Sequence, residues 1–286
     1  VALNFFDGKL EELARPENNT EIEVPDGRIV SLNWALVPGV GKVAVIRDVT
    51  TEMEAAQMKD AMLGVVSHEL RTPLAAIIGA ADMLQAIEDR AMMDGLIEIV
   101  LRNGARLLRL VNDLLDRAQL QKGEFSLEVK PFSPQSVEQE LLDIVTQHRE
   151  TTKLQIELDF HTDTDGPILG DLGRIVQIAR NLIDNAVKFT TEGNIRVKAY
   201  LENATLRITV VDTGMGIPPA QLPNIWQAFR RGADYGTRRT QGVGLGLSIV
   251  HALVTKMGGE TDVKSTEGQG SVFKITIPLE STNESE

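Results

Sequence analysis

The sequence predicts an α+β protein of several domains, and three observations carry that prediction. Short runs rich in Ile, Val and Leu alternate with turn signals over residues 21–50. Over residues 51–121 the apolar side chains recur with the period of an α-helix, and proline is absent between Pro73 and Gly123. From residue 124 onward, strand-like and helix-like segments follow one another in mixed order. We therefore expect a small sheet, a helical hairpin and a mixed α+β domain, in that order.

Composition excludes several classes of protein. Of the 286 residues, 42% are hydrophobic and 24% are charged, as in ordinary globular proteins. The 41 acidic and 29 basic side chains leave a net charge of −12, so we expect no nucleic-acid partner. The absence of cysteine excludes disulfides, thiolate metal sites and thiol nucleophiles, and it suits a reducing compartment.

The chain also lacks the signals of a membrane or secreted segment. No apolar run reaches the ~18 residues that cross a bilayer, and no signal peptide opens the sequence. We therefore expect a cytoplasmic segment that makes no membrane contact. Because the chain begins at Val1 rather than Met, we also expect it to be part of a longer protein.

Residues 21–50 are expected to form three antiparallel strands, over 21–24, 28–37 and 42–49. Pro-Asp-Gly at 25–27 and a proline- and glycine-rich run at 38–41 supply the turns between them. These strands look like the end of a small α/β domain.

Residues 51–121 are expected to form a helical hairpin, with helices over 51–86 and 94–121 joined by a polar connection at 87–93. Each helix carries an apolar stripe that a single hairpin would leave largely exposed. Pairing with a second copy, as a four-helix bundle, would cover both stripes. We therefore expect a homodimer through the hairpin.

Residues 124–286 are expected to form a largely antiparallel sheet with helices on one face. The predicted strands span 125–129, 154–160, 195–201, 206–211, 260–265 and 271–277. The predicted helices span 134–151, 170–189, 222–229 and 246–257. The tail from residue 280 is polar and is expected to fray.

His68 is the first candidate for chemistry. On a helical wheel the apolar residues of its helix, among them Leu70 and Ile77, fall on the side opposite His68. An imidazole is neutral near physiological pH and can act as a nucleophile, and Glu69 could accept its second ring proton. A lone histidine is more often a satisfied core residue, but the wheel places this one outward, among small residues that another macromolecule could approach.

A second candidate is the segment around residues 181–188. Asn181, Asn185 and Lys188 cluster within about 60° on a helical wheel, beside an apolar stripe. Amide oxygens together with phosphate suit Mg²⁺, and a lysine can neutralise phosphate. Taken alone, a polar helix rim explains this cluster equally well.

Two glycine loops complete the candidates. Asp212-Thr-Gly214-Met-Gly216 follows a predicted strand, and the glycines at 242, 244 and 246 open a predicted helix. Glycine lets backbone approach a ligand closely, and a helix N-terminus favours phosphate. The spacing does not fit the dinucleotide fingerprint or the Walker loop, and the motifs of eukaryotic-type protein kinases are absent.

The order of these motifs resembles the sensor histidine kinases of two-component systems, over residues 51–280. The segments similar to that family's H, N, G1, F and G2 boxes are, in order, His68-Glu69-Leu70-Arg71-Thr72-Pro73, Asn181 to Lys188, Asp212-x-Gly214-x-Gly216, Phe229, and Gly242-x-Gly244-Leu245-Gly246. The resemblance implies a dimerisation and phosphoacceptor domain over 51–121, an ATP-binding α/β sandwich like that of Hsp90, gyrase B and MutL over 124–280, and a polar tail over 281–286.

The resemblance also implies roles on the hairpin and in the lid. His68 would be phosphorylated from ATP with Glu69 as its base, and Thr72 would serve dephosphorylation of a response regulator. Residues 230–241 would form a lid over the nucleotide, hinged by Phe229 and Gly242. Within that lid, Arg231 would contact the γ-phosphate.

For the nucleotide itself, the resemblance implies a further set of contacts. Asn185 would bind Mg²⁺, with Asn181 and Lys188 near the phosphates. Asp212 would accept the adenine amino group. The glycine-loop residues beside the base and phosphates would be Gly214, Gly216, Gly244, Leu245 and Gly246.

Residues 1–50 resemble the last strands of a PAS sensor domain, ending in Asp48-Val49-Thr50, without its ligand-binding first half. The whole resemblance implies autophosphorylation of His68 from ATP, followed by transfer to an aspartate of a response-regulator receiver domain. One alternative is an ATPase like Hsp90 or MutL that releases free phosphate, which an outward His68 disfavours. Another is a non-catalytic scaffold or a regulator phosphatase. The sequence leaves open the signal, the regulator and whether transfer occurs within or between subunits.

Overall fold

The computed structural model describes residues 20–281, apart from 38, 40, 86, 88, 165 and 228–243. The chain divides into two units, Val1–Ser67 and His68–Glu286. None of the described helices combines the length and the hydropathy required to span a membrane.

The first unit contains a three-stranded antiparallel sheet in the order β1-β2-β3. Its strands are β1 (Thr20–Glu23), β2 (Ile29–Val37) and β3 (Gly41–Asp48). The three predicted strands are thus confirmed to within one residue at each end. Val30 and Leu32 on β2 are buried.

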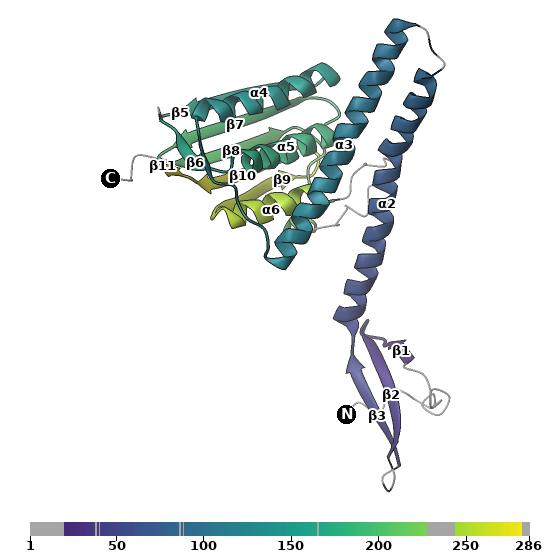
Figure 1. Cartoon of the computed structure of the whole chain (residues 1–286). Coiled ribbons are helices and arrows are strands. Elements are labelled where there is room, and N and C mark those ends of the chain that lie inside the picture. Colours follow the sequence, from purple (N-terminus) through teal and green to yellow (C-terminus); the bar gives the residue numbers. More distant parts are fainter. Residues whose placement is uncertain are drawn as a thin grey trace. The chain divides into compact units, whose positions relative to one another are not determined.

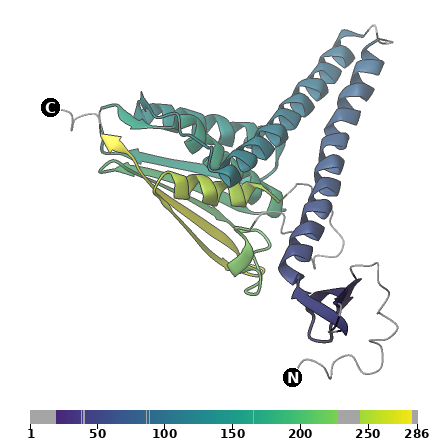
Figure 2. The same cartoon turned by 60° about the horizontal axis from the view of Figure 1, so that its bottom comes forward.

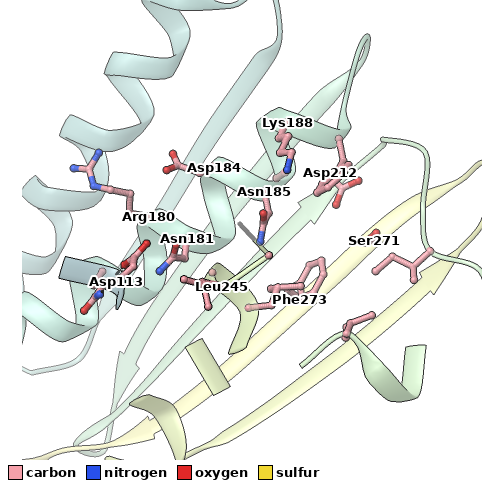
Figure 3. Close-up of a pocket in the computed structure, with 18 of the residues that line it drawn as sticks. Asp113, Arg180, Asn181, Asp184, Asn185, Lys188, Asp212, Leu245, Ser271 and Phe273 are labelled. Carbon is pink, nitrogen blue, oxygen red and sulfur yellow. Dashed lines mark hydrogen bonds between the residues drawn. The ribbon is translucent and has the colours of Figure 1, made fainter. Parts of the chain in front are cut away.

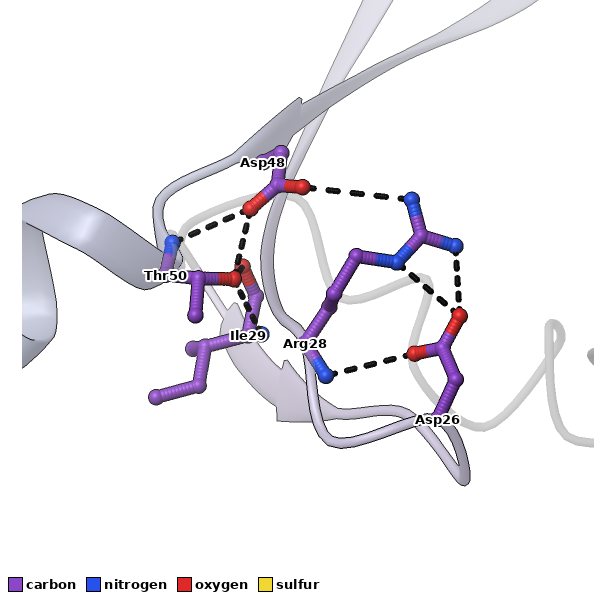
Figure 4. A network of polar contacts seen from close by, with 5 residues as sticks. All are labelled: Asp26, Arg28, Ile29, Asp48 and Thr50. Carbon is purple, nitrogen blue, oxygen red and sulfur yellow. Dashed lines mark hydrogen bonds and ion pairs between the residues drawn. The ribbon is translucent and has the colours of Figure 1, made fainter. Parts of the chain in front are cut away.

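Polar contacts tie the end of this sheet to the helix that follows (Figure 4). The backbone N–H and the hydroxyl of Thr50 both donate to Asp48, at 3.1 and 2.6 Å. The N–H of Ile29 donates to the same hydroxyl at 2.8 Å. The Arg28 guanidinium pairs with Asp26 at 2.7 Å. The Arg28 pair is exposed and adds little stability. The main effect of the cluster is to give the backbone N–H of Thr50, at the start of the helix, an acceptor.

The hairpin helices are α2 (Thr50–Leu84) and α3 (Arg90–Lys122). The predicted connection over 87–93 is too long, because α3 already begins at Arg90. The Asp89 side chain accepts hydrogen bonds from the N–H groups of Ala91 and Met92, at 2.8 and 3.3 Å, and so starts the helix earlier than its apolar pattern does. Gly123, with φ of 72°, ends it.

The α+β part of the second unit is built on a five-stranded sheet in the order β5-β7-β8-β10-β9. Its strands are β5 (Gln155–Thr162), β7 (Asn194–Glu202), β8 (Thr205–Asp212), β9 (Glu260–Thr266) and β10 (Gly270–Pro278). Only the β5–β7 pair of this sheet is parallel. The prediction of a largely antiparallel sheet is therefore confirmed.

Three helices cover one face of this sheet (Figure 1, Figure 2). They are α4 (Pro134–Thr151), α5 (Leu172–Phe189) and α6 (Gly246–Lys256). Side chains of β7 and β8 alternate between buried and more exposed, and α5 buries a stripe of helical period, so the core lies between the sheet and the helices. The fully buried large side chains include Ile175, Ile178, Leu182, Ile195 and Ile208.

A second, small sheet of order β11-β6-β4 corrects two expectations. Its strands are β4 (Lys130–Phe132), β6 (Ile168–Gly170) and β11 (Glu280–Ser281). The predicted strand over 125–129 is wrong. Phe125, in this range, is buried, and Cζ of Arg174 lies 4.8 Å from the centroid of its ring. The apolar side chain at this position therefore packs against Arg174 and does not indicate a strand. The predicted fray is also wrong for Glu280 and Ser281, which pair with β6. The rest of the predicted tail lies outside the described residues.

The predicted helix over 222–229 is another correction. Only a 3₁₀ turn, η2 (Leu222–Asn224), is present among the described residues of that range, which end at 227. Pro223 lies inside this turn, and a proline lacks the N–H that a continuing helix requires.

Candidate functional site

A cavity of about 1570 Å³ lies within the second unit. Its walls are α5, the loop that follows β8, the start of α6 and one face of α3. It gathers all nine of the sequence-predicted nucleotide residues that the structure describes: Asn181, Asn185, Lys188, Asp212, Gly214, Gly216, Gly244, Leu245 and Gly246. Figure 3 shows Asn185 and Lys188 on α5 beside Asp212, with Leu245 and Phe273 nearby.

The helix α5 positions the two asparagines and the lysine. Asp171 caps its start by accepting the N–H of Arg174 at 3.0 Å, and its buried apolar stripe fixes its rotation against the sheet. Asn181 and Asn185, one turn apart, then line the cavity. The ammonium of Lys188 lies 4.9 Å from the ring centroid of Phe189 at the same end of the helix. This wall presents amide groups and a cation.

Asp212 ends β8 and is 5% exposed. Its carboxylate accepts the N–H of Gly214 at 2.9 Å. Burial raises the pKa of Asp212, and hydrogen bonds from Gly214 and Ser271 oppose that shift. Asp212 therefore offers a fixed acceptor in a cavity that Phe273 and Leu245 also line.

The glycines of the loop after β8 have a packing reason for being glycine. A Cβ on Gly214 would collide with the carbonyl oxygen of Phe189. Gly216 has φ of 68°, and a Cβ there would collide with the backbone of Thr266. At the start of α6, a Cβ on Gly246 would lie 3.0 Å from Oδ1 of Asn181. Close packing of the loops therefore gives Gly214 and Gly216 a reason to be glycine besides the predicted approach of a ligand, which stays a prediction.

His68 is exposed to solvent, whereas its neighbour Glu69 is buried. His68 is exposed on α2, and the hydroxyl of Thr72 donates to its carbonyl oxygen at 3.2 Å. Glu69 is 5% exposed and accepts a hydrogen bond from Nη2 of Arg106 at 3.4 Å. Glu69 borders the cavity, whereas His68 and Thr72 are not among the residues that line it.

The expected contact between Glu69 and the imidazole is not formed. No hydrogen bond joins His68 to Glu69 in the described part of the chain, because adjacent residues on a helix point about 100° apart. The remaining predicted site residues, Phe229, Arg231 and Gly242, lie outside the described residues.

Several residues that line the cavity were not predicted from the sequence. Ser271 and Phe273 line the cavity from β10. Because alternate residues of a strand lie on the same face of a sheet, the spacing of two could have indicated that they share a wall of the site. Asp113 on α3 and Asp184 on α5 also line it. Asp184 lies 2.7 Å from Nε2 of His148 on α4. No local pattern marks these carboxylates, since only the packing of the helices brings them to the cavity.

Two family comparisons match this arrangement. Residues 58–123 match the His Kinase A (phospho-acceptor) domain, and residues 170–281 match the histidine kinase-, DNA gyrase B-, and HSP90-like ATPase. The chain carries both domains that sensor histidine kinases share. The phosphoacceptor match disfavours the ATPase alternative, which has no phosphohistidine. Both matches begin after residue 57, and the resemblance of residues 1–50 to a PAS domain stays a prediction.

Curated relatives are similar to this chain over most of its length. The sensor protein GacS of Pseudomonas syringae pv. syringae is 35% identical over 237 residues, 81% of this chain and 26% of GacS. BarA of Escherichia coli K12, a signal transduction histidine-protein kinase, is 36% identical over 232 residues, 79% of this chain and 25% of BarA. The autoinducer 2 sensor kinase/phosphatase LuxQ of Vibrio harveyi is 32% identical over 295 residues, 94% of this chain and 34% of LuxQ. The chain thus spans between a quarter and about a third of the length of these relatives.

Solved structures show the same fold. Full-length ShkA in complex with AMPPNP aligns with a TM-score of 0.54 and 30% identity, covering 78% of this chain and 46% of ShkA. The Acinetobacter baumannii histidine kinase AdeS aligns with a TM-score of 0.51 and 25% identity, covering 74% of this chain and 97% of the AdeS chain.

Proposed function

We propose that this chain binds ATP in the cavity between α5 and the loop after β8, and transfers the γ-phosphoryl group to His68. The observation that carries the proposal is the convergence of Asn181, Asn185, Lys188 and Asp212 on one cavity, in a chain whose α2 exposes His68. The AMPPNP bound by ShkA supports the choice of nucleotide.

The chemistry of each residue follows from its place. The Asp212 carboxylate accepts the adenine amino group, while Leu245 and Phe273 contact the base. Lys188 neutralises phosphate charge, and the amides of Asn181 and Asn185 face the phosphates. Phosphoryl transfer depends mostly on such positioning and charge neutralisation.

The residues present fit Mg²⁺ that arrives with the nucleotide. No group of three His, Asp or Glu side chains that could hold a metal unaided occurs among the described residues. Mg²⁺ is commonly held by one or two protein oxygens together with phosphates and waters, and Asn185, whose side-chain amide carries such an oxygen, lines the cavity where the phosphates would lie. Bound there, Mg²⁺ would offset the charge that develops on the phosphate oxygens.

His68 supplies the nucleophile. A ring nitrogen forms a bond to the γ-phosphorus, the bond from that phosphorus to the β–γ bridging oxygen breaks, and ADP leaves. The second ring nitrogen loses its proton, with Glu69 as the acceptor once the histidine has turned toward the cavity. The phosphoryl group then passes to an aspartate carboxylate of a response-regulator receiver domain, which frees the histidine. Thr72, exposed one turn from His68, serves the later dephosphorylation of the regulator, in which water attacks the aspartyl phosphate and inorganic phosphate leaves.

Dimerisation through the hairpin is part of the proposal. Leu101, Leu108 and Leu115 on α3 recur every seven residues and are 67%, 61% and 55% exposed. Ile78 on α2 is 52% exposed. A row of exposed leucines at this spacing is suited to a four-helix bundle. We therefore assign residues 51–121 to dimerisation and phosphoacceptance and 124–280 to nucleotide binding.

The test is labelling with ATP that carries ³²P at the γ-position, in the presence of Mg²⁺. We expect acid-labile, base-stable label on the wild type and none on His68→Gln. Asn185→Ala should remove both the label and nucleotide binding, whereas Gln139→Ala, an exposed residue on α4, is the matched control that retains both. Persistent label on His68→Gln, or release of free phosphate without labelled protein, would contradict the proposal.

A further inference from the structure

Three polar side chains stand in one row across three neighbouring strands of the large sheet. Asp212 on β8 is the register partner of Ser271 on β10, and Ser271 is the register partner of Ser265 on β9. Side chains directly opposite one another on adjacent strands share a face of the sheet, with Cβ atoms about 5 Å apart. Figure 3 shows the first two members of the row, Asp212 and Ser271, at the cavity.

The hydroxyl of Ser265 has three polar neighbours. The backbone N–H of Ile217, in the loop after β8, donates to it at 2.8 Å. The carbonyl oxygen of Gly270 lies 2.8 Å from Oγ of Ser265, and Oγ of Ser271 lies 3.0 Å from it. Ser265 itself is not among the described residues that line the cavity, although Ile217 and Ser271 are. Any effect of Ser265 on a bound nucleotide must therefore pass through these neighbours.

The direction of these hydrogen bonds follows from the number of protons. A serine hydroxyl donates one hydrogen bond and accepts up to two. The hydroxyl and the backbone N–H of Ser271 both bond to the carboxylate of Asp212. Because Ser271 gives its single proton to Asp212, it must accept from Ser265. The oxygen of Ser265 in turn accepts from Ile217. We call this chain of donors, which runs from the loop to the carboxylate, the relay.

The proton of Ser265 has a second acceptor within reach, the carbonyl oxygen of Gly270, and the charge on Asp212 decides between the two. Hydrogen bonds that involve an ionised group are about twice as strong as those between neutral groups, and neighbouring bonds in a chain strengthen one another. The ionised carboxylate therefore favours the relay. Without the Ser265 hydroxyl, the oxygen of Ser271 loses its donor, and its bond to Asp212 becomes weaker and less restricted in direction.

The loop after β8 is held in place without Ser265. The N–H of Gly268, in the turn between β9 and β10, donates to the carbonyl oxygen of Met215 at 2.7 Å. A Cβ on Gly216 would collide with the backbone of Thr266, so the loop and the turn are already in close contact. The relay to the carboxylate is therefore the distinct contribution of the Ser265 hydroxyl.

The relay leaves Asp212 with a defined open position. A carboxylate offers about four acceptor positions. Oδ1 of Asp212 accepts the N–H of Gly214 at 2.9 Å, and Ser271 supplies two further donors. The remaining position belongs to a buried side chain, 5% exposed, that lines the cavity. A ligand that offers one N–H donor there completes the set.

We propose that Ser265 is a positioning residue for base recognition, which acts through Ser271 to aim the Asp212 carboxylate at the 6-amino group of adenine. This inference rests on the proposed function, because Asp212 meets adenine only if the nucleotide binds in this cavity. It adds a residue outside the cavity that sets the selectivity of the site.

Two ligands separate this role from a structural one. ADP carries the 6-amino group, purine riboside 5′-diphosphate lacks it, and neither can phosphorylate His68. We expect Ser265→Ala to weaken ADP binding by about fivefold, roughly the value of one hydrogen bond, and to leave the affinity for purine riboside 5′-diphosphate unchanged. Calorimetry in the presence of Mg²⁺ measures both affinities. An equal loss for the two ligands would mean that Ser265 only supports the fold, and it would overturn the inference, as would no loss for either.

Two further variants show whether the hydroxyl itself is responsible. Ser265→Thr retains a hydroxyl and should keep the wild-type ratio of the two affinities. Thr209→Val is the matched control: it removes a hydroxyl from the opposite face of β8 that makes no hydrogen bond within the described part of the chain, and both affinities should stay unchanged. A threonine variant as weak for ADP as the alanine variant, or a control that shifts the ratio, would contradict the inference.

The double variant of Ser265→Ala with Asp212→Asn tests whether the two residues act together. If Ser265 acts through the carboxylate, the alanine change should not alter the affinity ratio further once Asp212 has been replaced, and a further fivefold fall would overturn the inference. Ser265→Cys, whose thiol is a weak donor, takes the place of an alanine variant that does not fold, with the same expected ratio. A wild type that binds neither diphosphate would refute the proposed function, whereas a wild type that binds both and is insensitive to Ser265→Ala would refute only the role of Ser265.

Discussion

The carboxylate of Glu69, on α2, lies 3.4 Å from Nη2 of Arg106, which belongs to α3. Its neighbour in the chain, His68, is exposed instead. The Glu69 side chain is 6% exposed and borders the cavity. Glu69 thus joins the two helices at the level of the histidine, and it becomes a base for His68 only if the imidazole turns toward it.

We predict that Glu69→Gln slows labelling of His68 by about 10²-fold or more, the usual effect of losing a general base, with little change in nucleotide affinity. Arg106→Gln keeps the carboxylate and removes only its partner, so it should lower the thermal midpoint without a comparable loss of rate. Single-turnover labelling and calorimetry measure the two effects. Equal rate losses in both variants would mean that Glu69 acts only by holding the helices together.

The Asp212 carboxylate leads to a prediction about base selectivity. It accepts the N–H of Gly214 and faces the space proposed for adenine. Asp212→Asn replaces an acceptor-only group with one that can also donate, and it should favour the 6-carbonyl of hypoxanthine over the 6-amino group of adenine. We expect the preference for ATP over ITP to fall by about 10- to 100-fold, the value of a hydrogen bond to a charged group. Competition binding measures the ratio, and an unchanged preference would place the base elsewhere.

The elements whose pattern is local could be predicted from the sequence. The periods of α2, α3 and α5 and the alternation of β7 and β8 follow from side chains that face one core. The strands β4, β6 and β11 could not be predicted, because they are two or three residues long and exist only where distant segments pair. The strand expected over 125–129 failed because an apolar residue such as Phe125 can pack on a side chain without joining a sheet.

The residues of the site also divide into those that a local motif predicts and those that only the tertiary packing brings together. Asn181, Asn185 and Asp212 stand in local motifs and were predicted. Asp113 and Gln177, 64 residues apart in the chain, meet only through the packing of α3 against α5. Nothing near either residue in the sequence indicates that contact.

The raised pKa of Asp113 predicts a pH dependence of stability. Burial and the Asp116 charge raise this pKa from 3.8 to about 6, while Gln177 and Arg109 oppose the shift and the Asp184 charge adds to it. Because the folded-state pKa lies above the unfolded value, the folded chain binds the extra proton between about pH 4 and pH 6. The stability that protonation contributes is complete below pH 4 and is lost as the pH rises through 6.

Asp113→Asn, which does not titrate, should therefore gain stability relative to the wild type as the pH rises from 4 to about 6, and the difference should stay constant above it. Calorimetric unfolding of both proteins across this range measures the difference. A difference that does not vary with pH would show that Asp113 is not buried beside Asp116 in solution.

The exposed leucines of α3 give the last prediction. Leu108 is 61% exposed in the single chain. It is the middle one of the three leucines, spaced seven residues apart, that are proposed to pair with a second copy. Leu108→Glu would place a charge on each side of that interface, where burial without a partner is costly, and we expect the dimer to dissociate at micromolar concentration. Light scattering coupled to size exclusion measures the mass. Leu142→Glu is the matched control, because Leu142 is a 39% exposed leucine on α4, outside the hairpin, and this variant should remain dimeric. A Leu108→Glu protein that keeps the dimer mass would exclude this face as the interface.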